Sequence, residues 1–388
     1  MAKDFEDYLR KENTIIKNSK VFDIGYLPDD ISKRKDTSTL FKETSVFINY
    51  GTPNHILLTG LPGLGKTVTV RYICRKKVLK EKGVDPIYIN CRDKTTTQIL
   101  NELIELSGNG TPVKNLSDTE MANMFLRTLV KPVLLVLDEI DRGRKVENLL
   151  YRLSRTSEID SVPHPPISMI LVSNNLSWDE AIDASIRSSL QLSRVFFRPY
   201  AVNELRDILK ERAKLGFFNE NVISITELEE IAKKTVEEKR SDCRVALKTL
   251  FYVAQKAEEQ SKNRVERKHI TNSFYIATTD IDRERITRLH NSQLLILYAC
   301  CENEGESFTK IFEVYGNYTV ELNIQNLSQT MVYYWIGYLS NQGFIKIFTK
   351  REKQHNGAPK KTLVINPLVK TRLVMEELSK RMLKLTND

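Results

Sequence analysis

The stretch that most restricts the fold of this 388-residue chain is TGLPGLGKT, residues 59–67. It has the spacing Gly-x-x-x-x-Gly-Lys-Thr and lies between an apolar run, HILLT, and a segment of helical character, VTVRYICRKKV. Glycines at these positions allow backbone N–H groups to converge on a phosphate at the N-terminus of a helix. The stretch therefore predicts a phosphate-binding loop that joins a strand to a helix in an α/β fold.

The loop supplies most of the predicted contacts with ATP or ADP. The Lys66 ammonium is expected to reach the β- and γ-phosphates, and the Thr67 hydroxyl is expected to ligate Mg²⁺. The predicted nucleotide contacts here are Gly60, Leu61, Pro62, Gly63, Leu64, Gly65, Lys66, Thr67 and Val68.

A second part of the same site is predicted by VLLVLDEID, in which an apolar run leads directly into Asp138 and Glu139. We expect Asp138 to hold Mg²⁺ and Glu139 to act as the general base toward the attacking water. By itself such a run is often a strand that meets solvent, but its combination with the loop favours catalysis. The next strand ends in ILVSNN, where Asn174, or its neighbour Asn175, is expected to position the water.

Five short apolar runs predict a parallel sheet covered by helices on both faces, because several of them are apolar throughout. The runs are residues 55–60, 85–90, 132–139, 168–174 and 194–200. Helical periodicity replaces the strands after Pro199, and the pattern changes again near residue 282. We therefore expect an α/β nucleotide-binding domain at 1–198, a helical lid at 199–281 and a third domain at 282–388.

Composition indicates the class of partner and the compartment. Lys and Arg number 59 against 50 acidic residues, and the net charge of +9 favours an anionic partner such as nucleic acid. The cysteines, two of them adjacent at Cys300 and Cys301, lack paired spacing, so we expect reduced thiols, no disulfide and no structural zinc. The charged N-terminus and the lack of a long apolar window predict a cytoplasmic protein with no membrane partner.

The elements in this order resemble an AAA+ ATPase: loop, acidic strand, strand-end Asn, edge Arg and helical lid. Further segments resemble one branch of that class, the archaeal replication initiators related to the eukaryotic origin recognition complex and its helicase-loading partner. These segments are YLPDDISKR, NCRDKTTTQILNELI, SNNLSWDEAIDASIRSSL, FRPYAVNELRDILKERA, and SDCRVAL followed by LFYVAQKAEE. The resemblance covers essentially the whole chain and implies a C-terminal winged-helix domain after the AAA+ domain and its lid.

The resemblance also implies roles for single residues. Pro28 and Arg34 would border the adenine, and Arg244 in SDCRVAL would be a second sensor of the γ-phosphate. Arg187 is the candidate for an arginine that acts on a neighbouring subunit, although the family commonly has an arginine at the position of Ser185. The catalytic residues would then be Glu139, Lys66, Asn174 and Arg244.

The segment NLSQTMVYYWIGYLSNQGFI predicts the recognition helix of the winged-helix domain. Its inward face, by helical spacing, consists of Val332, Trp335, Ile336 and Leu339. The opposite face offers polar and tyrosine side chains that suit base edges in a major groove, with the first of them as N-cap. These are Ser328, Gln329, Thr330, Tyr333 and Tyr334.

Gly343 is expected to end this helix, and FIKIFTK and KTLVINP are expected to form a hairpin with REKQHNGAPK at its tip. A merely solvated tip would have the same composition, but beside a recognition helix a basic tip suits phosphate or minor-groove contact. The predicted DNA contacts of this wing are Lys350, Arg351, Lys353, His355, Lys360 and Lys361. The resemblance adds Arg92, Lys94 and Thr95 in a helical insertion at 92–109.

Together these features predict an ATP-switched replication initiator associated with the nucleoid. It would bind double-stranded origin DNA, bend or underwind it, act beside a paralogous initiator and help to recruit the replicative helicase, with slow hydrolysis as a timer. The alternatives are a clamp-loader-like or junction ATPase, and an ATP-gated DNA-binding regulator or adaptor with little turnover. Equal activity on random and origin DNA would favour the first alternative, and specific binding that ignores ATP would favour the second.

Overall fold

The computed structural model describes residues 15–108, 116–155, 164–352 and 360–385. The chain divides into two compact units, Met1–Val265 and Glu266–Asp388. The first unit contains the α/β domain and three lid helices, and the second contains the C-terminal domain together with α13 (Ile270–Ile286), which spans the predicted boundary at 281/282. The domain boundaries of the sequence analysis stay predictions.

The first unit is built on a five-stranded parallel sheet with the strand order β2-β3-β4-β1-β5. Its strands are β1 (Ile56–Gly60), β2 (Asp85–Asn90), β3 (Val133–Asp138), β4 (Ile167–Ser173) and β5 (Ser193–Phe197). All five predicted strands are confirmed. The last one ends earlier than expected, because the N–H of Arg198 donates to Asp36 at 3.0 Å and Pro199 has no N–H for the sheet.

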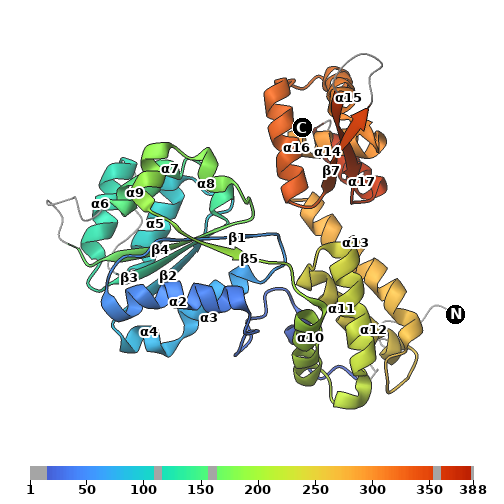
Figure 1. The fold of residues 1–388 in the computed structure, drawn as a ribbon, viewed down its shortest axis with the longest axis horizontal. Coiled ribbons are helices and arrows are strands. Elements are labelled where there is room, and N and C mark those ends of the chain that lie inside the picture. The colour runs from blue at the N-terminus through green and yellow to red at the C-terminus, as the bar shows by residue number, and fades with distance from the viewer. Residues whose placement is uncertain (1–14, 109–115, 156–163, 353–359, 386–388) are drawn as a thin grey trace. The chain divides into compact units, whose positions relative to one another are not determined.

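Helices cover both faces of this sheet (Figure 1). One face carries α2 (Lys35–Tyr50), α3 (Lys66–Arg75) and α4 (Lys77–Glu81), and the other carries α5 (Thr96–Leu106), α6 (Asp118–Thr128), α7 (Glu147–Ser154), α8 (Trp178–Ala181) and α9 (Ala184–Leu190). The single helix expected after the phosphate-binding loop is divided at Lys76, whose backbone is extended. Both β3 and β4 are buried along their whole length, as a sheet with two covered faces requires.

The lid consists of α10 (Val202–Gly216), α11 (Ile225–Lys239) and α12 (Cys243–Glu259), with a short 3-10 turn, η4 (Glu220–Val222), before α11. Residues 15–22, which precede α2, pack on these helices, and the sequence analysis did not predict this contact. The N–H groups of Ile15 and Ile16 both donate to the Glu258 carboxylate at 2.8 Å, and η1 (Ser19–Phe22) lies against α10. Gly216 leaves room for the Phe22 ring, because a Cβ there would lie 2.2 Å from it.

In the second unit, η5 (Arg267–His269) and α13 precede the domain predicted as a winged helix. That domain contains α14 (Asn291–Glu302), β6 (Glu306–Ser307), α15 (Phe308–Glu321), α16 (Gln329–Asn341), β7 (Ile345–Glu352), β8 (Lys360–Pro367) and α17 (Thr371–Leu385). Its strands form an antiparallel sheet in the order β6-β8-β7. This arrangement is consistent with a winged helix; β6 and α17 are additions that the sequence analysis did not anticipate.

The cysteines carry the free thiols that their spacing predicts. All five cysteines are free, and Cys300 and Cys301 are buried in α14. Within the described ranges, no helix is long and apolar enough to cross a membrane.

A buried histidine at the start of β1 makes the stability of the first unit depend on pH. His55 is 9% exposed, and its Nδ1 accepts a hydrogen bond from the N–H of Met169 at 3.2 Å. Burial lowers the pKa of His55 to about 4, so the folded protein holds this ring neutral. Below the ordinary pKa of histidine, His55 is protonated in the unfolded chain and stays neutral in the folded chain. Protonation of the unfolded state therefore lowers the free energy of unfolding as the pH falls toward 4.

We predict that His55→Asn, whose amide oxygen can still accept from Met169, reduces the stability lost by the first unit between pH 6.5 and 4. Between these pH values the variant should lose less free energy of unfolding than the wild type, by at most about 3 kcal/mol. Urea unfolding followed by Trp178 fluorescence in a Trp335→Phe background measures it. His164→Asn is the matched control, and an equal pH dependence in wild type and His55→Asn would contradict the prediction.

Candidate nucleotide site and DNA interface

The loop between β1 and α3 has the backbone geometry of a phosphate cradle. Gly63 (φ 79°) and Gly65 (φ 84°) both lie in the left-handed region, and Gly65 is the N-cap of α3. The loop therefore directs N–H groups toward one point at the helix N-terminus. The side chains of Thr67 and Val68, in the first turn of α3, are half-buried.

Lys66 is buried at this point, with 5% of its surface exposed. Its Nζ donates to the carbonyl oxygens of Gly60 at 2.6 Å and Leu61 at 2.8 Å. Burial lowers the pKa of Lys66 to about 8, while the carboxylates of Asp141 and Asp138 oppose that shift. The ammonium is thus charged at neutral pH and surrounded by acceptors, which suits a phosphate ligand.

The two predicted carboxylates lie at the C-terminal end of β3. Asp138 is 1% exposed and both its oxygens accept hydrogen bonds, one from the Glu139 N–H at 2.9 Å and the other from the Tyr88 hydroxyl at 2.8 Å. These donors hold the Asp138 carboxylate in one plane. Burial raises the pKa of Tyr88, so this phenol remains a neutral donor.

Glu139 is held differently from its neighbour. Its backbone has φ 53°, in the left-handed region, which turns its side chain out of the strand. The carboxylate lies 3.3 Å from Nε of Arg92, the residue predicted to contact DNA. Burial raises the pKa of Glu139, and Arg92 opposes the increase. A carboxylate with a raised pKa suits a general base, although the ion pair competes for it.

Asp141 is a third carboxylate of the site that the sequence analysis missed. It lies in η2 (Ile140–Arg142), which folds back after β3, and its Oδ1 accepts the N–H of Asn174 at 3.2 Å. This bond joins the ends of β3 and β4 and fixes the backbone of the predicted first sensor. Burial raises the pKa of Asp141. The signal was present in DEID, where an acid one turn beyond the strand can return to the site.

The lid reaches the loop through the N-terminus of α12. The N–H of Cys243 donates to the carbonyl of Gly63 at 3.1 Å, and a Cβ on Gly63 would lie 2.0 Å from Asp242 Oδ1. Asp242 also holds the guanidinium of Arg244 through two bonds, of 2.9 and 2.6 Å. The positive charge of Arg244 contributes to lowering the pKa of Lys66, so the predicted second sensor lies near the loop. The role of Asp242 was not anticipated.

The two residues predicted to border the adenine and the one predicted to act on a neighbouring subunit lie on other elements than the carboxylates and the loop. Pro28 is half-buried in the segment before α2, and Arg34 is 3% exposed with its guanidinium bound between α2 and α10. Arg187 is half-buried on α9, which packs on α7. Their roles toward adenine and toward a neighbouring subunit stay predictions.

The helix α16, which the sequence predicts to be a recognition helix, has the predicted faces. Val332, Ile336 and Leu339 are buried, and Trp335 packs on the same core. The side chain of Ser328 caps α16 by accepting the Met331 N–H, and Gly343 (φ 75°) follows the helix end as expected. The outward residues Gln329, Thr330, Tyr333 and Tyr334 are exposed.

The remaining predicted DNA contacts are only partly placed. Lys350 is exposed on β7, Arg351, Lys360 and Lys361 lie in the β7–β8 ladder, and Lys353 and His355 lie outside the described residues. Before α5, each predicted contact has an intramolecular partner: Arg92 pairs with Glu139, Lys94 with Glu102, and Thr95 caps the helix in a box with Gln98. Contact of these residues with DNA stays a prediction.

Comparison with known proteins identifies the class of ATPase. A family model described as an AAA domain matches residues 49–180, and one described as a Cdc6 AAA+ ATPase-type lid domain matches residues 206–274. The fold and the site define an AAA+ ATPase. The chain is 31% identical to the ORC1-type DNA replication protein of Thermococcus kodakarensis, over 88% of this chain and 86% of that protein. The chain belongs to the family of ORC1-type DNA replication proteins.

Two further relatives match over nearly the whole length. ORC1-type DNA replication protein 1 of Sulfurisphaera tokodaii is 27% identical over 98% of each chain. The Aeropyrum pernix ORC1 protein, solved in complex with DNA, superimposes with a TM-score of 0.69 at 26% identity, over 95% of this chain and 98% of that one.

We predict that Glu139→Gln lowers the rate of ATP hydrolysis by about 100-fold or more, because an amide cannot accept the proton of the attacking water. Nucleotide affinity should change little, since the phosphate contacts belong to the loop. Phosphate release at saturating ATP measures the rate. Glu147→Gln, at an exposed position of α7, is the control, and near-normal turnover of Glu139→Gln would assign the base elsewhere.

Proposed function

We propose that this chain is an ATP-switched initiator that binds double-stranded origin DNA through α16 and the β7–β8 hairpin. The observation that carries the proposal is the exposed polar and tyrosine face at the N-terminal end of α16, followed by a hairpin whose strands carry Lys350, Arg351, Lys360 and Lys361. A helix N-terminus of this kind suits base edges, and the basic hairpin suits phosphates. The Aeropyrum pernix relative solved with DNA supports the same reading.

The helical insertion predicted at 92–109, which includes α5, would add a second contact that bends or underwinds the duplex. The partners proposed for this assembly are a paralogous initiator on adjacent sites and the replicative helicase, and its place in the cell is the nucleoid. The net charge of +9 and the presence of two separate regions predicted to contact DNA support contact with more than one stretch of a duplex.

Mg²⁺ would accompany ATP. The Thr67 hydroxyl and the Asp138 carboxylate are oxygen donors of the kind that Mg²⁺ prefers, and Asp138 keeps lone pairs beyond its two hydrogen bonds. When bound, the ion would neutralise charge on the β- and γ-phosphates. Lys66 would hold the same phosphates, Glu139 would accept the proton of the attacking water, and the Asp141 bond would keep the Asn174 backbone in place.

Slow hydrolysis is supported by the pairing of Glu139 with Arg92 at 3.3 Å, because a base that is bound to a cation accepts a proton less readily. The same pairing favours the second candidate function, an ATP-gated DNA-binding regulator with little turnover. Single-turnover and steady-state rates with and without origin DNA separate the two. An initiator that uses hydrolysis as a timer should hydrolyse its bound ATP in a measurable single turnover. A regulator should keep its bound ATP unhydrolysed.

We predict that Gln329→Ala/Thr330→Ala abolishes the protection of a discrete origin element while leaving weak, uniform protection of DNA. Loss of two side chains that read base edges should reduce specific affinity by about 10-fold or more. A footprint on an origin fragment and on scrambled DNA of equal length measures it. Thr287→Ala, at an exposed position in the same unit, is the control, and unchanged protection in the double variant would exclude α16 as the reader.

We predict that Lys350→Ala weakens binding to origin and scrambled DNA alike. A phosphate contact carries no sequence information, and its loss should reduce the slope of log affinity against log salt by about 0.9. Fluorescence anisotropy at several salt concentrations gives the slope. Lys380→Ala removes the same charge from α17 and should leave the slope unchanged; an equal effect of both variants would indicate a general charge effect in place of a wing contact.

A further inference from the structure

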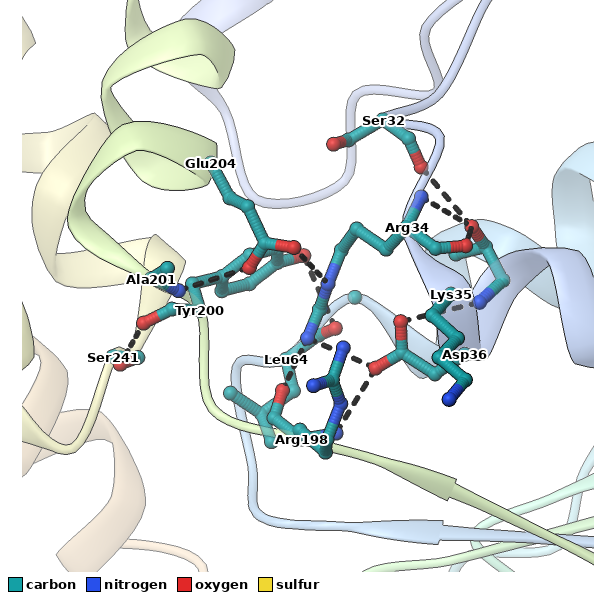
Figure 2. Close-up of polar contacts among 12 residues, drawn as sticks. Ser32, Arg34, Lys35, Asp36, Leu64, Arg198, Tyr200, Ala201, Glu204 and Ser241 are labelled. Carbon is teal, nitrogen blue, oxygen red and sulfur yellow. Dashed lines mark hydrogen bonds and ion pairs between the residues drawn. The ribbon is translucent and has the colours of Figure 1, made fainter.

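A buried arginine joins the segments that meet behind the phosphate-binding loop. Arg34, at the N-cap of α2, is 3% exposed and donates through Nη2 to the carbonyl of Arg198 (Figure 2). It forms ion pairs with Asp36 at 2.9 Å and, through Nε, with Glu204 of α10 at 3.5 Å. One guanidinium thus connects the start of α2, the link after β5 and the first turn of the lid.

The same guanidinium lies over the ring of Tyr200, 4.1 Å from its centroid. Tyr200 is 7% exposed, and its hydroxyl donates to the carbonyl of Leu64 in the phosphate-binding loop at 3.1 Å. Its own carbonyl accepts a hydrogen bond from Ser241, just before α12, at 2.8 Å. Tyr200 therefore touches the loop with its side chain and the lid with its backbone.

The Tyr200 hydroxyl lies directly against the phosphate-binding loop. A Cβ on Gly65 would lie 2.6 Å from the Tyr200 oxygen, so the glycine and the phenol occupy neighbouring space. A cation over an aromatic face stabilises one ring position, and here the cation is itself fixed by Asp36 and Glu204. Movement of Arg34 would release the ring and, with it, the bond to Leu64.

We propose that Arg34 is a positioning residue for the nucleotide, which it does not touch: it acts through Tyr200 to hold the phosphate-binding loop against the lid. This differs from the adenine-bordering role implied by the resemblance, and it does not depend on the proposal about DNA. Loss of either side chain should weaken ADP binding, since the loop must then be ordered by the nucleotide itself.

The test is a double-mutant cycle in the full-length chain. Tyr200→Phe keeps the ring beneath the guanidinium and removes only the hydroxyl, and Arg34→Met removes the cation at similar length. We expect each single variant to raise the Kd for ADP by about tenfold, which equals about 1.4 kcal/mol. In the Tyr200→Phe background, Arg34→Met should raise the Kd for ADP by less than about twofold further, because both side chains act through the hydrogen bond from Tyr200 to Leu64.

The rate of ATP hydrolysis and the stability without nucleotide distinguish a positioning role of Arg34 from a general disturbance of the fold. The rate at saturating ATP should stay within about twofold of wild type, since the carboxylates are untouched. Stability without nucleotide should fall in Arg34→Met, which leaves the buried Asp36 carboxylate and the half-buried Glu204 carboxylate without their cation. It should fall little in Tyr200→Phe. Arg206→Met, an arginine of α10 paired with Asp207, is the matched control and should leave the Kd unchanged.

Two results would overturn the proposal. Effects on Kd that multiply in the double variant would mean that Arg34 contacts the nucleotide independently, as an adenine-bordering residue does. An unchanged Kd in Tyr200→Phe would mean that the Leu64 bond only supports the fold. If Arg34→Met does not fold, Arg34→Lys takes its place in the cycle, because it keeps the charge and loses the planar group that stacks on the ring.

Discussion

The close approach of the lid to the phosphate-binding loop is the contact on which the arrangement of the nucleotide site depends. The Cys243 N–H bonds to the Gly63 carbonyl, and Asp242 occupies the space that a side chain at Gly63 would need. A residue with a Cβ there would also have to adopt φ 79°, which only glycine does without strain. The loop, the first turn of α12 and Arg244 therefore take up one arrangement together.

Charge at the site is balanced among groups that burial would otherwise neutralise. Lys66 is buried near Asp138 and Asp141, Asp242 holds Arg244, and Arg92 holds Glu139. Burial shifts the pKa of Lys66 down and those of Glu139 and Asp141 up, and each shift is opposed by a charged neighbour. A nucleotide would bring negative charge to Lys66 and Arg244, so the site is suited to respond to its presence.

The strands and the loop were predictable because their signals are local. An apolar run of strand length, followed by glycines and a lysine at set spacing, has few other structures available to it. The inward face of α16 was predictable for the same reason, since Val332, Ile336 and Leu339 repeat at helical spacing. The early end of β5 was not predictable, because it depends on Asp36, and the return of Asp141 to the site depends on the turn after β3.

The sequence by itself determined the class of protein, the residues of the loop and the acidic strand, and the presence of a helix with a polar face before a basic hairpin. Only the tertiary structure decided that Arg34 contacts Arg198, that Arg92 contacts Glu139 and that Asp242 lies against Gly63, because these partners are distant in the chain. Arg34 and the carbonyl of Arg198 are 164 residues apart, and no periodicity or spacing relates them. Such contacts form only when the sheet brings its strand ends together, so a pattern read along the chain cannot contain them.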